Sequence, residues 1–139
     1  MPVQILFALL LLVFAGSCAS GLAGAAVRQS GAREVVLARG ASQRVANTDL
    51  TVFFDTVVED SRCPRGVNCV WAGDAAVRVR IEEPGAPPAT HTLHTNDGFQ
   101  REFAHDDLRV ELASLTPEPT TEGPPRPDDY RVTLLIRRK

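Results

Sequence analysis

From residue 33 to the end of the chain, apolar and polar side chains alternate at every second position, which is the period of a half-buried β-strand. Four runs are clear, and their apolar members are Leu50, Val52 and Phe54; Val77, Val79 and Ile81; Leu108, Val110 and Leu112; and Tyr130, Val132, Leu134 and Ile136. The positions between them are mostly polar or charged, so each run has one face for a core and one for water. The pattern therefore predicts an all-β protein built from antiparallel strands.

Turn-forming residues divide the chain into short pieces. Gly40 separates a strand at 34–38 from one at 43–46, and Asn96-Asp97-Gly98 lies between extended runs at 90–95 and 99–103. Because Asp-Gly between two extended runs favours a hairpin, we expect those two runs to pair. Seven to eight short strands within residues 33–139 predict a single antiparallel β-sandwich with Ig-like character, and a small β-barrel is the alternative.

One connection is unusually long. Residues 116–129 hold five of the ten prolines and no large apolar side chain. We interpret this segment as a stiff crossover that carries the last strand to the other sheet. A functional role is the alternative, since long loops without regular structure often have one.

The first residues have the character of an export signal. Eleven apolar residues at 5–15 are too few to span a bilayer as a helix, and small residues follow at once. Ala15-Gly16-Ser17-Cys18 resembles a bacterial lipobox, which predicts a signal peptide at 1–17, a lipid on Cys18 and a flexible tether at 18–32. Ordinary cleavage after Ala19 or within 22–26 is the alternative. The protein is thus expected to be exported, as a membrane-anchored lipoprotein or in periplasmic or secreted form.

Cysteine usage agrees with an oxidising compartment. If Cys18 is lipidated or removed, only Cys63 and Cys69 remain, and they lie in one short loop. A zinc site needs four ligands, whereas this pair has no neighbouring histidine. The two cysteines are therefore predicted to form a disulfide.

The most specific motif surrounds this pair, from Asp60 to Asp74. The sequence here resembles a group of small exported bacterial proteins that share D-S-R-C-P-x4-C-x-W-x-G between two strands. The likeness extends from Gly40-x-Ser42 to Tyr130-x-Val132-x-Leu134. The group has no assigned activity, so the resemblance implies a fold and export but no mechanism.

An architectural interpretation of the motif assigns its polar residues to the loop itself. Asp60 and Ser61 would cap the loop backbone, Arg62 would pair with Asp60 or Asp74, and Trp71 would pack across the disulfide inside the sandwich.

In the alternative interpretation the loop, made rigid by its disulfide, presents side chains to a partner, because a rigid loop loses less entropy on binding. Arg62, Arg65 and Asn68 would then make the contacts. The candidate binding loop comprises Asp60, Arg62, Arg65, Asn68, Trp71 and Asp74.

Charge and histidine placement bear on function. A net charge of −2 provides no surplus for a nucleic-acid backbone, so no nucleic-acid partner is expected. On one strand His91 and His94 point to opposite faces and cannot share a metal. His105-Asp106-Asp107 is interpreted as a solvated turn, and neither a metal nor a cofactor is predicted.

The expected function is that of a non-enzymatic binding module for an envelope protein or glycan, which contacts a membrane only through a lipid on Cys18. A purely structural envelope component is one alternative. A metal-dependent hydrolase around His105 is the other.

Overall fold

The computed structural model describes residues 31–139. The signal peptide at 1–17, Cys18 and nearly all of the tether lie outside the described residues. The strands are β1 (Arg33–Ala38), β2 (Ser42–Arg44), β3 (Thr51–Asp60), β4 (Ala75–Glu82), β5 (Ala89–His94), β6 (Glu102–His105), β7 (Leu108–Thr116) and β8 (Arg131–Arg138), and a short 3-10 helix, η1, spans Pro127–Asp129.

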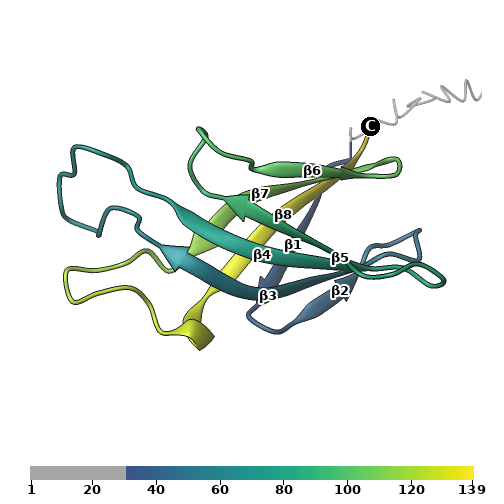
Figure 1. Ribbon diagram of the computed structural model, residues 1–139, viewed down its shortest axis with the longest axis horizontal. Coiled ribbons are helices and arrows are strands. Elements are labelled where there is room, and N and C mark those ends of the chain that lie inside the picture. Colours follow the sequence, from purple (N-terminus) through teal and green to yellow (C-terminus); the bar gives the residue numbers. More distant parts are fainter. Residues whose placement is uncertain (1–30) are drawn as a thin grey trace, which may run out of the picture.

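The strands form two antiparallel four-stranded sheets, in the orders β1-β8-β7-β6 and β2-β3-β4-β5 (Figure 1). The sheets do not close on one another, which confirms the predicted β-sandwich over the barrel. The chain passes from one sheet to the other at the β1–β2 and β5–β6 connections. No helix of the described part of the chain is long and apolar enough to cross a membrane.

The core lies between the sheets and consists of the alternating residues of the sequence pattern. In β4, for example, Ala75, Val77, Val79 and Ile81 are buried, while the intervening residues are partly or fully exposed. The other sheet contributes its own alternating residues, and all of these positions fall in one hydrophobic cluster. Each fully buried aliphatic side chain contributes about 1.5–3 kcal/mol, so this alternation is what holds the sheets together.

The predicted hairpin at 96–98 is wrong. β5 pairs with β4, and β6 pairs with β7 in the other sheet. The Asn96 side chain donates to the carbonyl of Gly73 at 2.9 Å, and the backbone N–H of Asn96 donates to Asp74 at 3.0 Å. Because the turn is tied sideways to the β3–β4 connection, the chain leaves its sheet here instead of doubling back along it.

The predicted crossover at 116–129 is also wrong, because β7 and β8 are antiparallel neighbours in one sheet. The proline-rich segment is thus a long hairpin loop. Its Pro119 carbonyl accepts a hydrogen bond from the backbone N–H of Arg65 at 2.9 Å, so it packs against the disulfide loop. Proline composition held no information about which strands the segment joins.

Both long loops lie at the same end of the sandwich. In Figure 1 the β3–β4 and β7–β8 loops are at the left, while the start of β1 and the C-terminus are at the right. We call the end that carries loops 61–74 and 116–129 the braced end.

Candidate functional site

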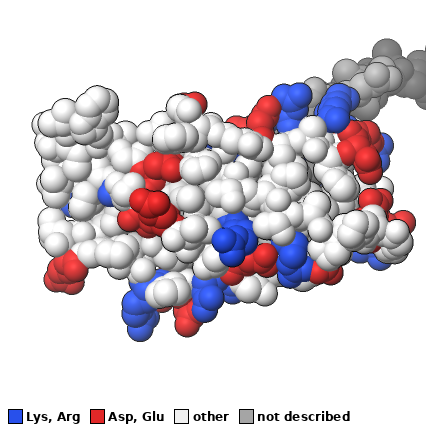
Figure 2. All heavy atoms as spheres, in the orientation of Figure 1, with Lys and Arg blue, Asp and Glu red and all other residues white. Residues whose placement is uncertain are grey.

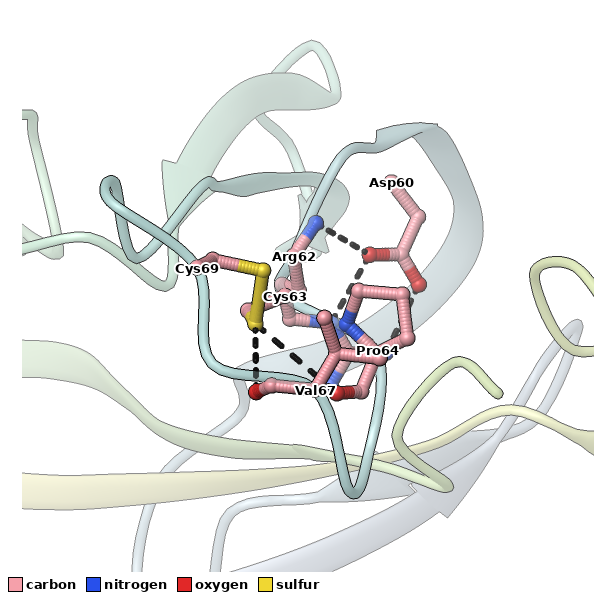
Figure 3. The surroundings of a disulfide bond; sticks show 6 residues. All are labelled: Asp60, Arg62, Cys63, Pro64, Val67 and Cys69. Atoms are coloured by element: carbon pink, nitrogen blue, oxygen red, sulfur yellow. Dashed lines mark hydrogen bonds and ion pairs between the residues drawn. A yellow bond between two sulfur atoms is a disulfide. The ribbon is translucent and has the colours of Figure 1, made fainter. Parts of the chain in front are cut away.

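The β3–β4 loop continues as a narrow ribbon beyond the end of the sandwich. The backbone N–H of Ser61 donates to the backbone carbonyl of Asp74 at 2.7 Å, and that of Cys63 donates to the backbone carbonyl of Ala72 at 3.1 Å. Cys63 and Cys69 form a disulfide across its tip, with their Cα atoms 5.9 Å apart (Figure 3), which confirms the predicted pairing.

A polar cluster of Asp60, Arg62 and Tyr130 anchors this ribbon to the sandwich. The Asp60 carboxylate accepts hydrogen bonds from Arg62 Nε at 2.8 Å, from Arg62 Nη2 at 2.7 Å and from the Tyr130 hydroxyl at 2.8 Å. The side chains of Asp60 and Arg62 are only 3% and 12% exposed. Because both side chains are shielded from water, removing one of them would leave an uncompensated buried charge, so this pair is costlier to break than a surface ion pair.

Arg62 also reaches the other sheet. Its Nη1 donates to the carbonyl of Leu115 at 2.6 Å and its Nη2 to that of Pro117 at 2.8 Å. All of its terminal nitrogens are thus engaged within the protein. Arg62 pairs with Asp60 and not with Asp74, as the architectural interpretation of this residue allows.

The cluster shifts the acid–base equilibria of its members. Burial alone would raise the pKa of Asp60, but the hydrogen bonds from Arg62 and Tyr130 favour the carboxylate more strongly, and the pKa lies below its ordinary value. Burial, together with the hydrogen bond to Asp60, raises the pKa of Tyr130 to about 12.

A second carboxylate, Asp74, organises the other side of the ribbon. Its Oδ2 is 2.6 Å from Nδ1 of His94, and its Oδ1 accepts from the backbone N–H of Asn96 at 3.0 Å and the Thr95 hydroxyl at 3.3 Å. Burial raises the pKa of Asp74, but the hydrogen bonds, that from His94 above all, outweigh it and lower the pKa. The ring of Phe99 lies 5.1 Å from that of His94, so an aromatic side chain covers this pair.

The placement of Trp71 contradicts the architectural interpretation. Its side chain is 83% exposed, and its neighbour Val70 is 92% exposed. The reason is geometric. Trp71 lies on the ribbon beyond Ala75, the first core residue of β4, where no second sheet packs over it.

Between the ribbon and the β5–β6 turn lies a cavity of about 500 Å³, which we call the aromatic groove. Its large apolar side chains are Trp71 and Phe99, and the polar side chains that line it include Asp74, His94, Asn96 and Glu59. In Figure 2 most of the visible surface over the 61–74 loop is free of Lys, Arg, Asp and Glu.

The remaining predicted loop residues lie elsewhere. Arg65 and Asn68 are exposed, and neither lines the groove. Arg65 faces Glu118 of the proline-rich loop at 3.5 Å, with both side chains largely in water. The structure thus brings Trp71 and Asp74 together and leaves these two residues apart from them.

Sequence reasoning missed Phe99, His94 and Asn96 as parts of this site. His94 is the last residue of β5, and Asn96 and Phe99 lie in the β5–β6 connection, which was expected to form a paired hairpin. The signal that could have found them is Phe99 itself, a large aromatic residue directly after Asp97-Gly98, where a turn offers no core. His91 and His94 are separate, as predicted: His91 stacks on Phe103 at 3.8 Å, while His94 pairs with Asp74.

Comparison of the chain with protein-family models, with curated proteins and with solved structures gave no match.

Proposed function

We propose that the protein is an exported binding module that holds a saccharide of the cell envelope in the aromatic groove. The observation that carries the proposal is Trp71, the chain's one tryptophan, standing 83% exposed on a loop that is braced on both sides. Phe99, 57% exposed, faces the same groove. Tryptophan is mostly buried in proteins and dominates binding energy where it is presented.

The groove is held in shape before any ligand arrives. The disulfide closes the ribbon, the Asp60 cluster fixes its first strand, and Asp74 ties its second strand to the β5–β6 turn. A preformed site avoids the entropy cost of ordering a loop on binding.

The size of the groove suits a small ligand. A cavity of about 500 Å³ falls in the range of small-molecule sites. Aromatic faces stack on the C–H faces of sugar rings, and the His94, Asn96 and Asp74 side chains offer partners for hydroxyl and amide groups. The nearby carboxylates of Glu59 and Asp74 favour a neutral saccharide over an anionic one.

Export and lipid attachment complete the proposal. The described chain begins at the end of the sandwich opposite the braced end (Figure 1). A lipid on Cys18 would therefore connect to the domain at the end opposite the aromatic groove. Detergent partitioning and a mass increase that Cys18→Ser abolishes would support this part, and an unmodified N-terminus at Ser20 or within 23–26 would contradict it.

Trp71 itself provides the binding assay. Neutral N-acetylglucosamine oligomers should shift its emission to the blue as the indole leaves water. Phe99→Ala keeps the reporter and should abolish the shift, while the double variant Arg65→Ala/Asn68→Ala, which alters exposed loop residues outside the groove, should bind like the wild type.

Two outcomes would contradict the proposal. If no envelope saccharide changes the emission of the wild type, the ligand class is wrong. If the shift persists in Phe99→Ala and is lost in the double variant, the site is the loop surface around Arg65 instead of the groove.

A further inference from the structure

Three potential metal ligands lie close together outside the aromatic groove, where the β4–β5 connection of one sheet comes near the β6–β7 turn of the other. Glu83 directly follows β4 in one sheet, while His105 ends β6 in the other and Asp106 directly follows it. One oxygen or nitrogen atom from each lies within 4.8 Å of the others. We propose that Glu83, His105 and Asp106 bind one divalent transition-metal ion, with zinc as the probe.

The distances suit a shared ion. Nε2 of His105 is 3.5 Å from Oε2 of Glu83 and 3.8 Å from Oδ2 of Asp106. Ligand atoms about 2.0–2.2 Å from a tetrahedral zinc lie roughly 3.3–3.6 Å from one another. The two distances from His105 are close to this range, and the Glu83 and Asp106 oxygens lie within 4.8 Å of each other.

The nitrogen that would bind is unsatisfied. Nε2 of His105 is shielded from solvent and has no hydrogen-bond partner among residues 31–139. Buried nitrogens are nearly always paired, because an unpaired polar group loses its hydration without compensation. A bound cation would give this lone pair the partner that the protein does not.

The donor set narrows the choice of ion. One imidazole nitrogen with two carboxylates is a mixed set, whereas calcium and magnesium prefer oxygen alone. Asp106 is 75% exposed, so the site opens to water on that side and solvent can complete the coordination. The sequence suggested only a solvated turn here, because Glu83 is distant along the chain and joins the cluster through the packing of the two sheets.

An ion at this place would act as a clamp. It would connect the β4–β5 connection of one sheet to the β6–β7 turn of the other, beside the stacked rings of His91 and Phe103. Because the unfolded chain does not hold these ligands together, zinc should stabilise the folded state by mass action.

The test titrates metal-free protein, purified after expression of the full chain, with zinc alone. Calorimetry should show one equivalent bound, and the melting temperature should rise with zinc concentration. Glu83→Gln and His105→Gln should each weaken binding by at least about tenfold, in the range reported even for residues that only support metal ligands. His94→Gln, which alters the other histidine–carboxylate pair, is the matched control and should bind zinc like the wild type.

Side-chain ¹⁵N spectra locate the ion directly, since zinc should shift the His105 ring nitrogens and leave those of His94 unchanged. Melting curves without zinc show that each variant is folded. Absence of stoichiometric binding, or binding that survives His105→Gln or moves the His94 signals, would overturn the proposal and leave Glu83 and His105 as an ordinary ion pair. The zinc experiments and the saccharide assay test different sites, so either proposal can fail without affecting the other.

Discussion

Replacing Asp60 by asparagine removes a negative charge on which Arg62 and Tyr130 converge at the braced end. The side chain keeps its shape, so the change tests charge and hydrogen bonding with little effect on packing. The Arg62 guanidinium, only 12% exposed, is left without its ionic partner.

The expected loss of stability follows from the burial of Arg62. Breaking a buried ion pair by removing one partner costs about 3–5 kcal/mol. Because Arg62 keeps the carbonyls of Leu115 and Pro117 as acceptors, we expect the lower end, about 3 kcal/mol. For a domain of this size that loss lowers the melting temperature by roughly 10 °C or more.

The single tyrosine of the chain allows a second, spectroscopic readout. Ionisation of Tyr130, followed by phenolate absorbance, should have its midpoint at about 12 in the wild type. In Asp60→Asn the midpoint should fall toward the ordinary value, while burial, the first cause of the shift, still holds it somewhat higher.

The cluster makes stability rise with pH in the acid range and fall with pH in the alkaline range. The pKa of Asp60 is lowered by folding, so its contribution is present above about pH 4 and is lost as the pH falls through the folded-state value. The pKa of Tyr130 is raised, so its contribution is complete below about pH 10 and is lost as the pH rises through about 12. Asp60→Asn should show a flatter profile on the acid side.

Asp49→Asn is the matched control, because Asp49 pairs with Arg44 while both side chains are 68% exposed. Little change in stability is expected there. An Asp60→Asn protein that melts with the wild type and titrates Tyr130 at about 12 would refute the assignment of the cluster as the anchor of the ribbon.

Two further predictions concern the motif. Replacing Cys63 and Cys69 by alanine opens a seven-residue loop and should lower the free energy of unfolding by about 2 kcal/mol on the chain-entropy estimate. Denaturant unfolding of the oxidised protein and of the double variant measures the difference. Equal stabilities would show that the ribbon is held by its other contacts. Gly73→Ala would place a Cβ 1.9 Å from the Ser61 carbonyl oxygen at a φ of +70° and should disrupt the ribbon severely. Gly66→Ala, with a φ of +79° and open space around it, should cost only roughly 1–2 kcal/mol of folding free energy. Similar melting curves for the two glycine variants would contradict the close approach at Gly73.

The strands and core could be predicted from the sequence because alternation is a local property. A position such as Val79 must face the core whatever its strand pairs with, since its neighbours on either side are arginines. The disulfide could be predicted for a similar reason, because Cys63 and Cys69 are close along the chain.

The pairing of strands was harder to predict from the sequence, because it depends on contacts between distant segments. Asp97-Gly98 indicates a turn, but whether the chain then pairs with the strand it has left is decided by the bonds of Asn96 to the β3–β4 connection. The same limit applied to the site. Trp71 could be identified from composition, yet its exposure follows from the ribbon extending beyond the sheets. Its groove is completed by His94 at the end of β5 and by Phe99 from the following turn, whose path was predicted wrongly.

Under the proposed function, the motif combines the two roles that the sequence presented as alternatives. Asp60, Arg62 and Gly73 are committed to contacts within the protein, so changes to them should be read as losses of stability. Trp71 has no such commitment: it projects into water and adds little to the core. If the proposed function is correct, binding and folding depend on different residues of one loop. A Phe99→Ala protein that melts like the wild type but no longer responds to saccharide would separate the two, because Phe99 lies outside the motif and reaches the groove from the neighbouring turn.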